Sequence, residues 1–409
     1  MQRVGSKWIS VRWTVLESMR VLEGFDAASR ASTAEAMLDA MSTLYEAPAQ
    51  NMLTADTAGT IGIRSTGRYP LRPGDGRGDL LRDGTLSASD WTGYWSPSEY
   101  PQAIRPAQGF LVSANQEPFD PKVQARYFGA NWERPWRAMQ INKLLRADSA
   151  VTPDAMQRMQ SDPGSARADL FVPAFLNAAR AAPENATVTR AATLLAEWDR
   201  GYTRENRRAV LFEEMMRQLS LRLWDELRTD STGNPIPSDM MIATLLSDSS
   251  SAWWDDLATP MLERRDALLR DAMSTALDSV VARRGEPTDD RWRWDHVRFA
   301  NIFHLLRLPA FSRREIPVQG GSATVWPSTG DGRHGPSWRM VVELSTPRRA
   351  WATYPGGQSG NPISMRYDDR LTSWRNGRLD TLRLPATSEQ LSERQQRAQL
   401  VLTPTGRAR

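Results

Sequence analysis

The spacing of hydrophobic residues changes along the chain and indicates where strands give way to helices. Residues 8–14 (WISVRWT) and the segment TIGIRS at 60–65 alternate apolar with polar side chains, which is typical of strands. Residues 33–46 (TAEAMLDAMSTLYE) repeat apolar residues every three to four positions. This spacing predicts a helix with Ser32 or Thr33 as its N-cap.

Residues 51–110 are rich in Gly, Pro, Asp and Trp, which predicts a loop-heavy surface of the kind that often builds sites. The apolar run FLVSA at 110–114 predicts a buried strand. From residue 135 to about 306 the apolar spacing is helical, and Thr152 followed by Pro153 gives one clear helix start.

After residue 310 the pattern returns to strands separated by Gly-rich turns. The predicted strands are SATVWPS (322–328), SWRMVVEL (337–344) and RAWATYP (349–355). We therefore expect a mixed α and β chain in four segments. They are strands and site loops at 1–135, a mostly helical region at 136–308, C-terminal strands at 309–385, and a polar tail at 386–409.

Composition describes an ordinary globular chain and disfavours several classes of protein. The 409 residues are 40% hydrophobic and 24% charged, and 16 tryptophans supply large apolar surfaces. Of the 52 basic residues three are lysines, which leaves 49 arginines. The net charge is +4 with no run of like charges, so nucleic-acid binding is disfavoured. No apolar stretch approaches the length of a membrane span, and the first residues have no signal-peptide core.

Motifs for metal or nucleophile chemistry are weak. There is no Cys, and the three histidines (His296, His304 and His334) form no ligand pair at helical spacing; we expect His296 and His304 to lie on a helix and to be structural. GGQSGNP (356–362) lacks the second Gly of a nucleophile elbow, so a turn is favoured for Ser359. GDGRGD (74–79) does not fit a calcium-binding EF-hand loop and predicts an irregular turn.

Four sequence blocks, in order along the chain, carry a resemblance to a known protein family. The first reads LYEAPAQNMLTADTAGTIGIRSTGRYPLRPGDG (44–76), and the second, DWTGYWSPSEYPQAIRPAQGFLVSANQEP (90–118), contains the pair Ala114-Asn115. The third is ANWERPWRAMQINKLL (130–145). The fourth joins GPSWRMVVEL to YPGGQSGNPISMRYDDRLTSWRNG (354–377). Together these blocks resemble the penicillin acylase family of N-terminal-nucleophile hydrolases. They cover nearly the whole chain in order, while the helical middle is similar to the family only in character.

The resemblance implies the C-terminal part of a four-layer αββα sandwich with a large helical insertion. It also implies hydrolysis of an amide between an acyl group and an amine, with β-lactam side chains and acyl-homoserine lactones as substrate classes. In the family a precursor cleaves itself and exposes a serine whose own α-amino group acts as the base, which suits a chain with so few histidines.

Two residues correspond to functional positions of the family. Asn115 matches the asparagine of the oxyanion hole, and Arg137 matches an active-site arginine 22 residues further on. The alternative for Asn115 is a turn-capping residue after a strand. The alternative for Arg137 is a surface arginine paired with Glu133.

The resemblance also implies that the serine lies on an upstream segment of the same precursor, so we expect this chain alone to be inactive. Ser6 in GSKW is similar to the family's cleavage site, but Lys7 stands where the family has Asn. Most calcium ligands of the family have no counterpart here, and we assign no metal or cofactor, although the intact family member can hold calcium. The expected partners are a small amide substrate and the nucleophile segment, with no nucleic acid or membrane, and the intact protein is expected in the periplasm or secreted. The competing hypothesis is a non-catalytic remnant that binds a partner.

Overall fold

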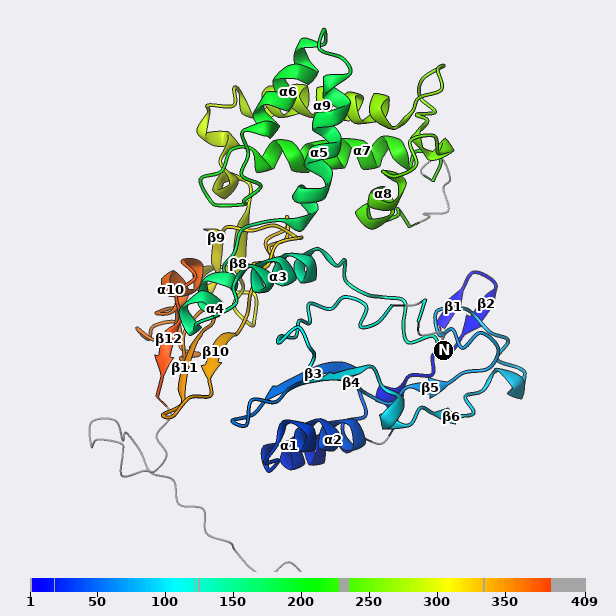
Figure 1. Ribbon diagram of the computed structural model, residues 1–409, viewed down its shortest axis with the longest axis vertical. Coiled ribbons are helices and arrows are strands. Elements are labelled where there is room, and N and C mark those ends of the chain that lie inside the picture. The colour runs from blue at the N-terminus through cyan, green and yellow to red at the C-terminus, as the bar shows by residue number, and fades with distance from the viewer. Residues whose placement is uncertain are drawn as a thin grey trace, which may run out of the picture. The chain divides into compact units, whose positions relative to one another are not determined.

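A computed structural model describes residues 2–17, 19–120, 122–123, 126–227, 235–333 and 335–383. The chain divides into two compact units, Met1–Pro336 and Ser337–Arg409, and each is described by itself. Among the described residues the first unit contains several helices and small antiparallel sheets, and the second contains one helix and one antiparallel sheet (Figure 1).

The first unit holds nine of the labelled helices within the described residues. They are α1 (Val21–Ser29), α2 (Ala34–Leu44), α3 (Trp136–Ala147), α4 (Pro153–Met159), α5 (Ala166–Arg180), α6 (Ala186–Ala196), α7 (Ala209–Leu223), α8 (Asp239–Leu245) and α9 (Arg265–Arg284). Its strands are β1 (Gln2–Val4), β2 (Lys7–Ile9), β3 (Gln50–Ala55), β4 (Ile61–Thr66), β5 (Pro70–Leu71), β6 (Gly93–Tyr94), β7 (Gln102–Ile104), β8 (Phe299–Ile302) and β9 (Arg313–Pro317).

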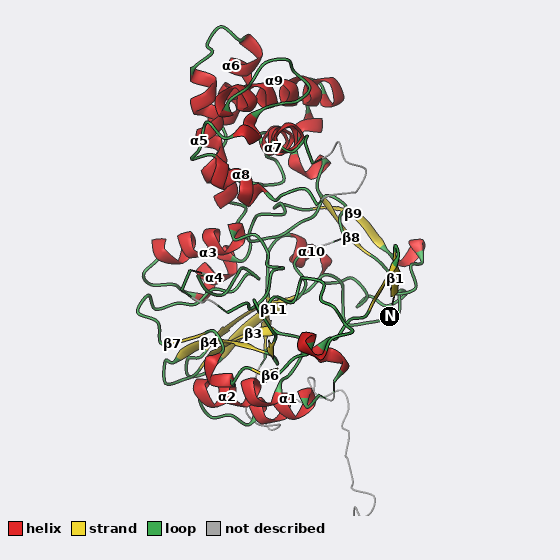
Figure 2. Ribbon diagram, turned by 90° about the vertical axis from the view of Figure 1, so that its right-hand side faces the viewer, coloured by secondary structure: helices red, strands yellow, loops and turns green. Residues whose placement is uncertain are grey.

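The sheet that lies under the candidate site is antiparallel with the order β3–β4–β7, and α2 packs against it (Figure 2). Asp56 closes the turn between β3 and β4, because its carboxylate accepts hydrogen bonds from the backbone N–H groups of Ala34, Thr60 and Ala58 at 2.9–3.0 Å. These donors, Ala34 first, hold the pKa of Asp56 below its usual value. Gly62 lets β4 lie close to α2: a Cβ there would lie 2.8 Å from Leu38 Cδ1, so this side chain would have to shift.

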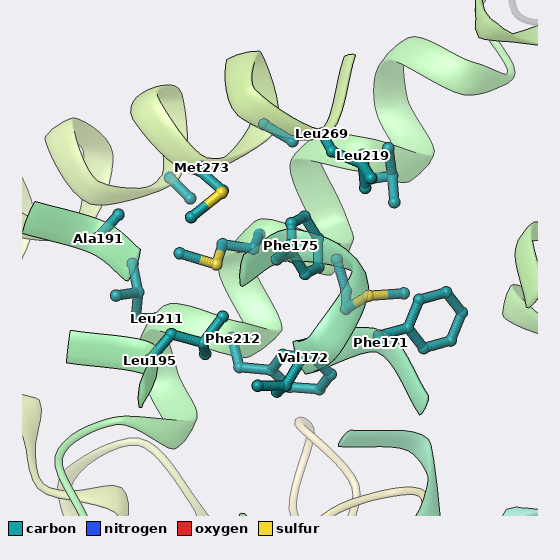
Figure 3. Close-up of a cluster of buried hydrophobic side chains, with 14 of the residues drawn as sticks. Phe171, Val172, Phe175, Ala191, Leu195, Leu211, Phe212, Leu219, Leu269 and Met273 are labelled. Carbon is teal, nitrogen blue, oxygen red and sulfur yellow. The ribbon is translucent and has the colours of Figure 1, made fainter. Parts of the chain in front are cut away.

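The helices α5, α6, α7 and α9 share one hydrophobic core (Figure 3). Phe171 and Phe175 of α5 and Phe212 of α7 are fully buried in it, as are Leu269 and Met273 of α9. Their three- and four-residue spacing places one apolar face of each helix inward, as the sequence predicts.

Charged residues are also buried in this helical region. Arg167 of α5 forms ion pairs with Glu213 at 3.0 Å and with Asp239 at 2.7 Å, and the hydroxyl of Tyr202 donates to Glu213 at 2.6 Å. Burial raises the pKa of Glu213, but the charges of Arg167 and Arg298 and the hydrogen bonds from Tyr202 and Arg167 together outweigh burial, so the pKa is lowered. The charges of Arg167, Glu213 and Asp239 are therefore paired with one another, because an unpaired charge in a low-dielectric interior costs free energy.

The second unit is built on a sheet with the order β10 (Arg339–Glu343), β11 (Arg349–Thr353) and β12 (Asp380–Leu382), together with α10 (Leu371–Arg375). Val341 of β10 is buried, while Met340 and Val342 on the other face are about half exposed. Arg339 donates to the carbonyl oxygen of the buried Trp374 at 3.1 Å and so ties the sheet to α10.

Several predicted elements are confirmed. Thr33 caps α2 by accepting from the N–H of Ala36 at 3.1 Å, and Thr152 caps α4, which begins with Pro153. The predicted strands at 60–65, 337–344 and 349–355 correspond to β4, β10 and β11.

Other predicted elements are wrong or too long. The strand expected at 8–14 is limited to β2, which ends at Ile9. Trp8 in β2, and Val11 and Trp13 beyond it, are exposed rather than buried. Residues 322–328 form tight turns, because the Thr324 hydroxyl bonds to backbone oxygens within the segment. The α-helices of the region predicted to be helical up to about residue 306 end with α9 at Arg284. His296 lies in a short 3-10 helix, whereas His304 follows β8 and lies outside any helix.

Truncating Phe175 tests the helical core. We expect Phe175→Ala to lower the free energy of unfolding by about 3–5 kcal/mol, because it removes a fully buried ring and leaves a cavity. Leu170→Ala on the same helix is the matched control, since Leu170 is 36% exposed and should cost less than about 1 kcal/mol. Urea unfolding followed by circular dichroism measures both, and equal losses would contradict this description of the core.

Acid sensitivity should depend on Glu214, which links α7 to α9. Burial raises its pKa, but hydrogen bonds from Arg217, Gln218 and Arg283 outweigh burial and lower the pKa to about 2. The folded pKa lies below the unfolded value, so this stabilisation is present above about pH 4.5 and is lost as the pH falls toward 2. Glu214→Gln should therefore be less stable than the parent at pH 7, and the difference in unfolding free energy should shrink by pH 3.

Candidate functional site

The segment that carries Asn115 is held to the sheet by side chains and not by a strand ladder. The strand predicted at 110–114 is wrong: these residues are extended loop. The Gln116 side chain bonds to backbone groups that would otherwise pair with a neighbouring strand. Its Oε1 accepts from Ala114 N at 2.7 Å, and its Nε2 donates to Val112 O at 3.3 Å. Because this segment is a loop and not a paired strand, the direction of the Asn115 side chain is not set by a sheet.

Asn115 has left-handed backbone geometry, with φ +65°. Asn is one of the few non-Gly residues that adopts this conformation readily. Its carbonyl oxygen accepts from Glu133 N at 2.9 Å, so the segment just before α3 holds its backbone. The side chain itself is exposed.

Arg137 fixes which way the Asn115 carboxamide faces. Its Nη2 donates to Ala114 O at 2.8 Å and to Asn115 Oδ1 at 2.9 Å. A guanidinium only donates, so the carboxamide must turn its oxygen toward Arg137 and its NH₂ group away. Among the described residues nothing accepts from this NH₂ group, which leaves an exposed and oriented donor.

The structure thus brings the two predicted site residues into direct contact. Within the described part of the chain, no ion pair joins Arg137 to Glu133, the alternative partner considered from the sequence. Their catalytic roles remain predictions.

A cavity of about 220 Å³ lies between this loop and the sheet β3–β4–β7. Its walls include Asn51, Ser65 and Gln116. The Ser65 hydroxyl donates to Asn51 Oδ1 at 2.5 Å, and Asn51 Nδ2 donates to Ser113 Oγ at 3.0 Å. Sequence reasoning did not identify Ser113 and Gln116, and only their nearness to Asn115 could have marked them.

The other candidate residues lie in turns. Ser6 is exposed in the turn between β1 and β2, and Ser359 bonds within its own loop, accepting from Asn361 N at 3.1 Å. Asp75 and Asp79 of GDGRGD pair with Arg82 and Arg77. Among the described residues no group of three or more acidic or histidine side chains could hold a metal ion, and no helix is long and apolar enough to cross a membrane.

The backbone geometry of Asn115 predicts different costs for two substitutions. Both Asn115→Ala and Asn115→Gly remove the carboxamide that Arg137 holds, but only Ala carries a Cβ into the left-handed region. Asn115→Ala should be less stable than Asn115→Gly by about 1–2 kcal/mol. Denaturant unfolding of the two variants measures this, and equal stability would show that the residue is not held at positive φ.

Comparisons with known proteins identify the family of this chain. The family profile described as "Penicillin amidase" matches residues 2–391. An acyl-homoserine lactone acylase QuiP from Pseudomonas aeruginosa is 26% identical over 438 residues, which cover 95% of this chain and 50% of that protein. A penicillin acylase 2 proenzyme from a Pseudomonas strain is 27% identical over 354 residues, covering 79% of this chain and 42% of that protein.

The fold is also similar to a solved one. The thermostable penicillin G acylase from Alcaligenes faecalis matches with a TM-score of 0.72 and 17% identity, over 95% of this chain and 73% of that one. This likeness confirms the expected N-terminal-nucleophile hydrolase fold. The chain spans about half the length of the acyl-homoserine lactone acylase that it matches. The family match over nearly the whole chain shows that it belongs to the penicillin amidase family.

Proposed function

We propose that this chain supplies the oxyanion-stabilising side of an amide hydrolase that cleaves acyl–amine bonds. One observation carries the proposal: Arg137 holds Asn115 Oδ1 and leaves the Asn115 NH₂ group exposed and oriented as a donor. Preorganised donors of this kind act where negative charge develops during acyl transfer.

In the proposed reaction a serine hydroxyl attacks the carbonyl carbon of the substrate amide. The serine's own α-amino group takes the hydroxyl proton, and the carbonyl oxygen becomes an oxyanion that accepts from Asn115 Nδ2. Collapse expels the amine, which receives the proton, and water then releases the acid from the acyl-enzyme. Arg137 stays cationic throughout and polarises the Asn115 carboxamide, which strengthens it as a donor.

The serine in this proposal comes from a segment outside these 409 residues, which would be the partner of this chain. Family membership and the half-length match to an acyl-homoserine lactone acylase support this assignment. N-acyl-homoserine lactones and β-lactams with acyl side chains are the proposed substrate classes. The same resemblance supports a periplasmic or secreted location for the intact protein.

Replacing the donor alone tests the proposal. Asn115→Asp keeps an oxygen for Arg137 and suits the left-handed backbone, but it removes the NH₂ donor. In the chain assembled with the serine-bearing segment, we expect kcat for an acyl-homoserine lactone to fall by about 10²–10³-fold. Lactone release followed by mass spectrometry measures the rate.

Asn185→Asp is the matched control. Asn185 caps α6 by accepting from Val188 N at 3.0 Å, and Asp caps a helix equally well, so this variant should keep full activity. Parent-like activity in Asn115→Asp would overturn the oxyanion assignment. Hydrolysis of a chromogenic acyl anilide by residues 1–409 alone would overturn the assignment of the nucleophile to another segment.

A further inference from the structure

Two adjacent residues at the start of α3 contact different regions of the first unit. Arg137 reaches Ala114 and Asn115 in the site loop. Trp136 is 1% exposed and packs against Phe171 of the helical core, with ring centroids 6.1 Å apart. The first turn of α3 therefore connects the site loop to the helical core.

Asp239 holds this turn from the core side. The indole N–H of Trp136 donates to Asp239 Oδ1 at 3.1 Å, and Arg134 Nε lies 3.5 Å from the same oxygen. The helix α3 begins after Pro135 with no side-chain cap and no acidic residue in its first turn. The side chains on both sides of Pro135, those of Arg134 and Trp136, therefore contact the same oxygen of Asp239.

Asp239 is itself buried and ion-paired. It is 8% exposed, and Arg167 Nε lies 2.7 Å from its second oxygen, Oδ2. Arg167 is fixed in turn by Glu213 and, through it, by Tyr202. Removing one partner from such a buried pair leaves an uncompensated charge, so a substitution at Asp239 should disturb the network.

We propose that Asp239 is a positioning residue for the Arg137–Asn115 pair. It acts through Trp136 by fixing the first turn of α3, and it lies 103 residues from Trp136 along the chain. The importance of this pair for catalysis rests on the function proposed above; the mechanical coupling from Asp239 to Asn115 does not.

The test uses the complete 409-residue chain with ¹⁵N-labelled asparagine side chains. The Asn115 carboxamide signal is assigned by its loss in Asn115→Gly. We expect Trp136→Phe, which removes the N–H donor, and Asp239→Asn, which removes the charge facing Arg167, to shift or broaden this signal.

Trp292→Phe is the control for a purely structural role. Trp292 is fully buried in the same hydrophobic cluster, and its indole N–H donates to Gly285 O at 2.8 Å. The Trp292→Phe variant should lower the melting temperature, as Trp136→Phe does, but it should leave the Asn115 carboxamide signal unchanged. If Trp136→Phe does not fold, the Asn115 signal in Asp239→Asn tests the proposal, because Asn has nearly the same side-chain volume as Asp.

Activity gives a second measurement in the chain assembled with the serine-bearing segment. Asp239→Asn should lower kcat on the order of tenfold to a hundredfold with little change in KM, because a displaced donor stabilises the transition state less. An unchanged Asn115 signal in Asp239→Asn, or an equal shift in Trp292→Phe, would overturn the proposal. A shifted signal together with full activity of Asn115→Asp would support the coupling and refute the proposed function alone.

Discussion

The two hydrogen bonds from the Arg137 guanidinium to Ala114 O and Asn115 Oδ1 are the interaction on which the candidate site depends. The loop that carries Asn115 has no strand ladder, and the Asn115 side chain is exposed. Packing therefore cannot choose its rotamer. A donor-only cation beside it does so, and in the same contact it determines which end of the carboxamide faces outward.

Two regions of the first unit cooperate to make that contact. The sheet supplies the floor, because Asn51 links Ser65 of β4 to Ser113 of the loop. The helical region supplies the arginine, because α3 is tied to it by Gln140, which donates to Asp162 at 2.7 Å, and by Lys143, which pairs with Asp169 at 2.6 Å. A site built between two such regions is sensitive to changes far from the reacting atoms.

The sequence predicted correctly those elements that are marked by residues within the element itself, such as helix caps and alternating strand residues. The caps Thr33 and Thr152 mark helix starts, and the alternating residues of β10 and β11 mark a sheet with one buried face. The segments at 110–114 and 322–328 were misassigned because side chains such as Gln116 and Thr324 satisfy their backbone groups, and apolar spacing does not record such bonds. The contact between Asn115 and Arg137 also lies beyond local spacing, and only the family resemblance singled out the two residues.

The left-handed conformation of Asn115 has a consequence for how this position changes in evolution. Asn, Asp and Gly all suit φ +65°, but only Asn offers a carboxamide donor. A gene copy that drifts from Asn to Asp or Gly here would keep its fold while losing the donor. Selection for folding alone would therefore accept Asn, Asp or Gly at position 115, whereas selection for the reaction would keep Asn. The residue found at this position in a natural relative thus indicates whether that relative is under selection for the reaction.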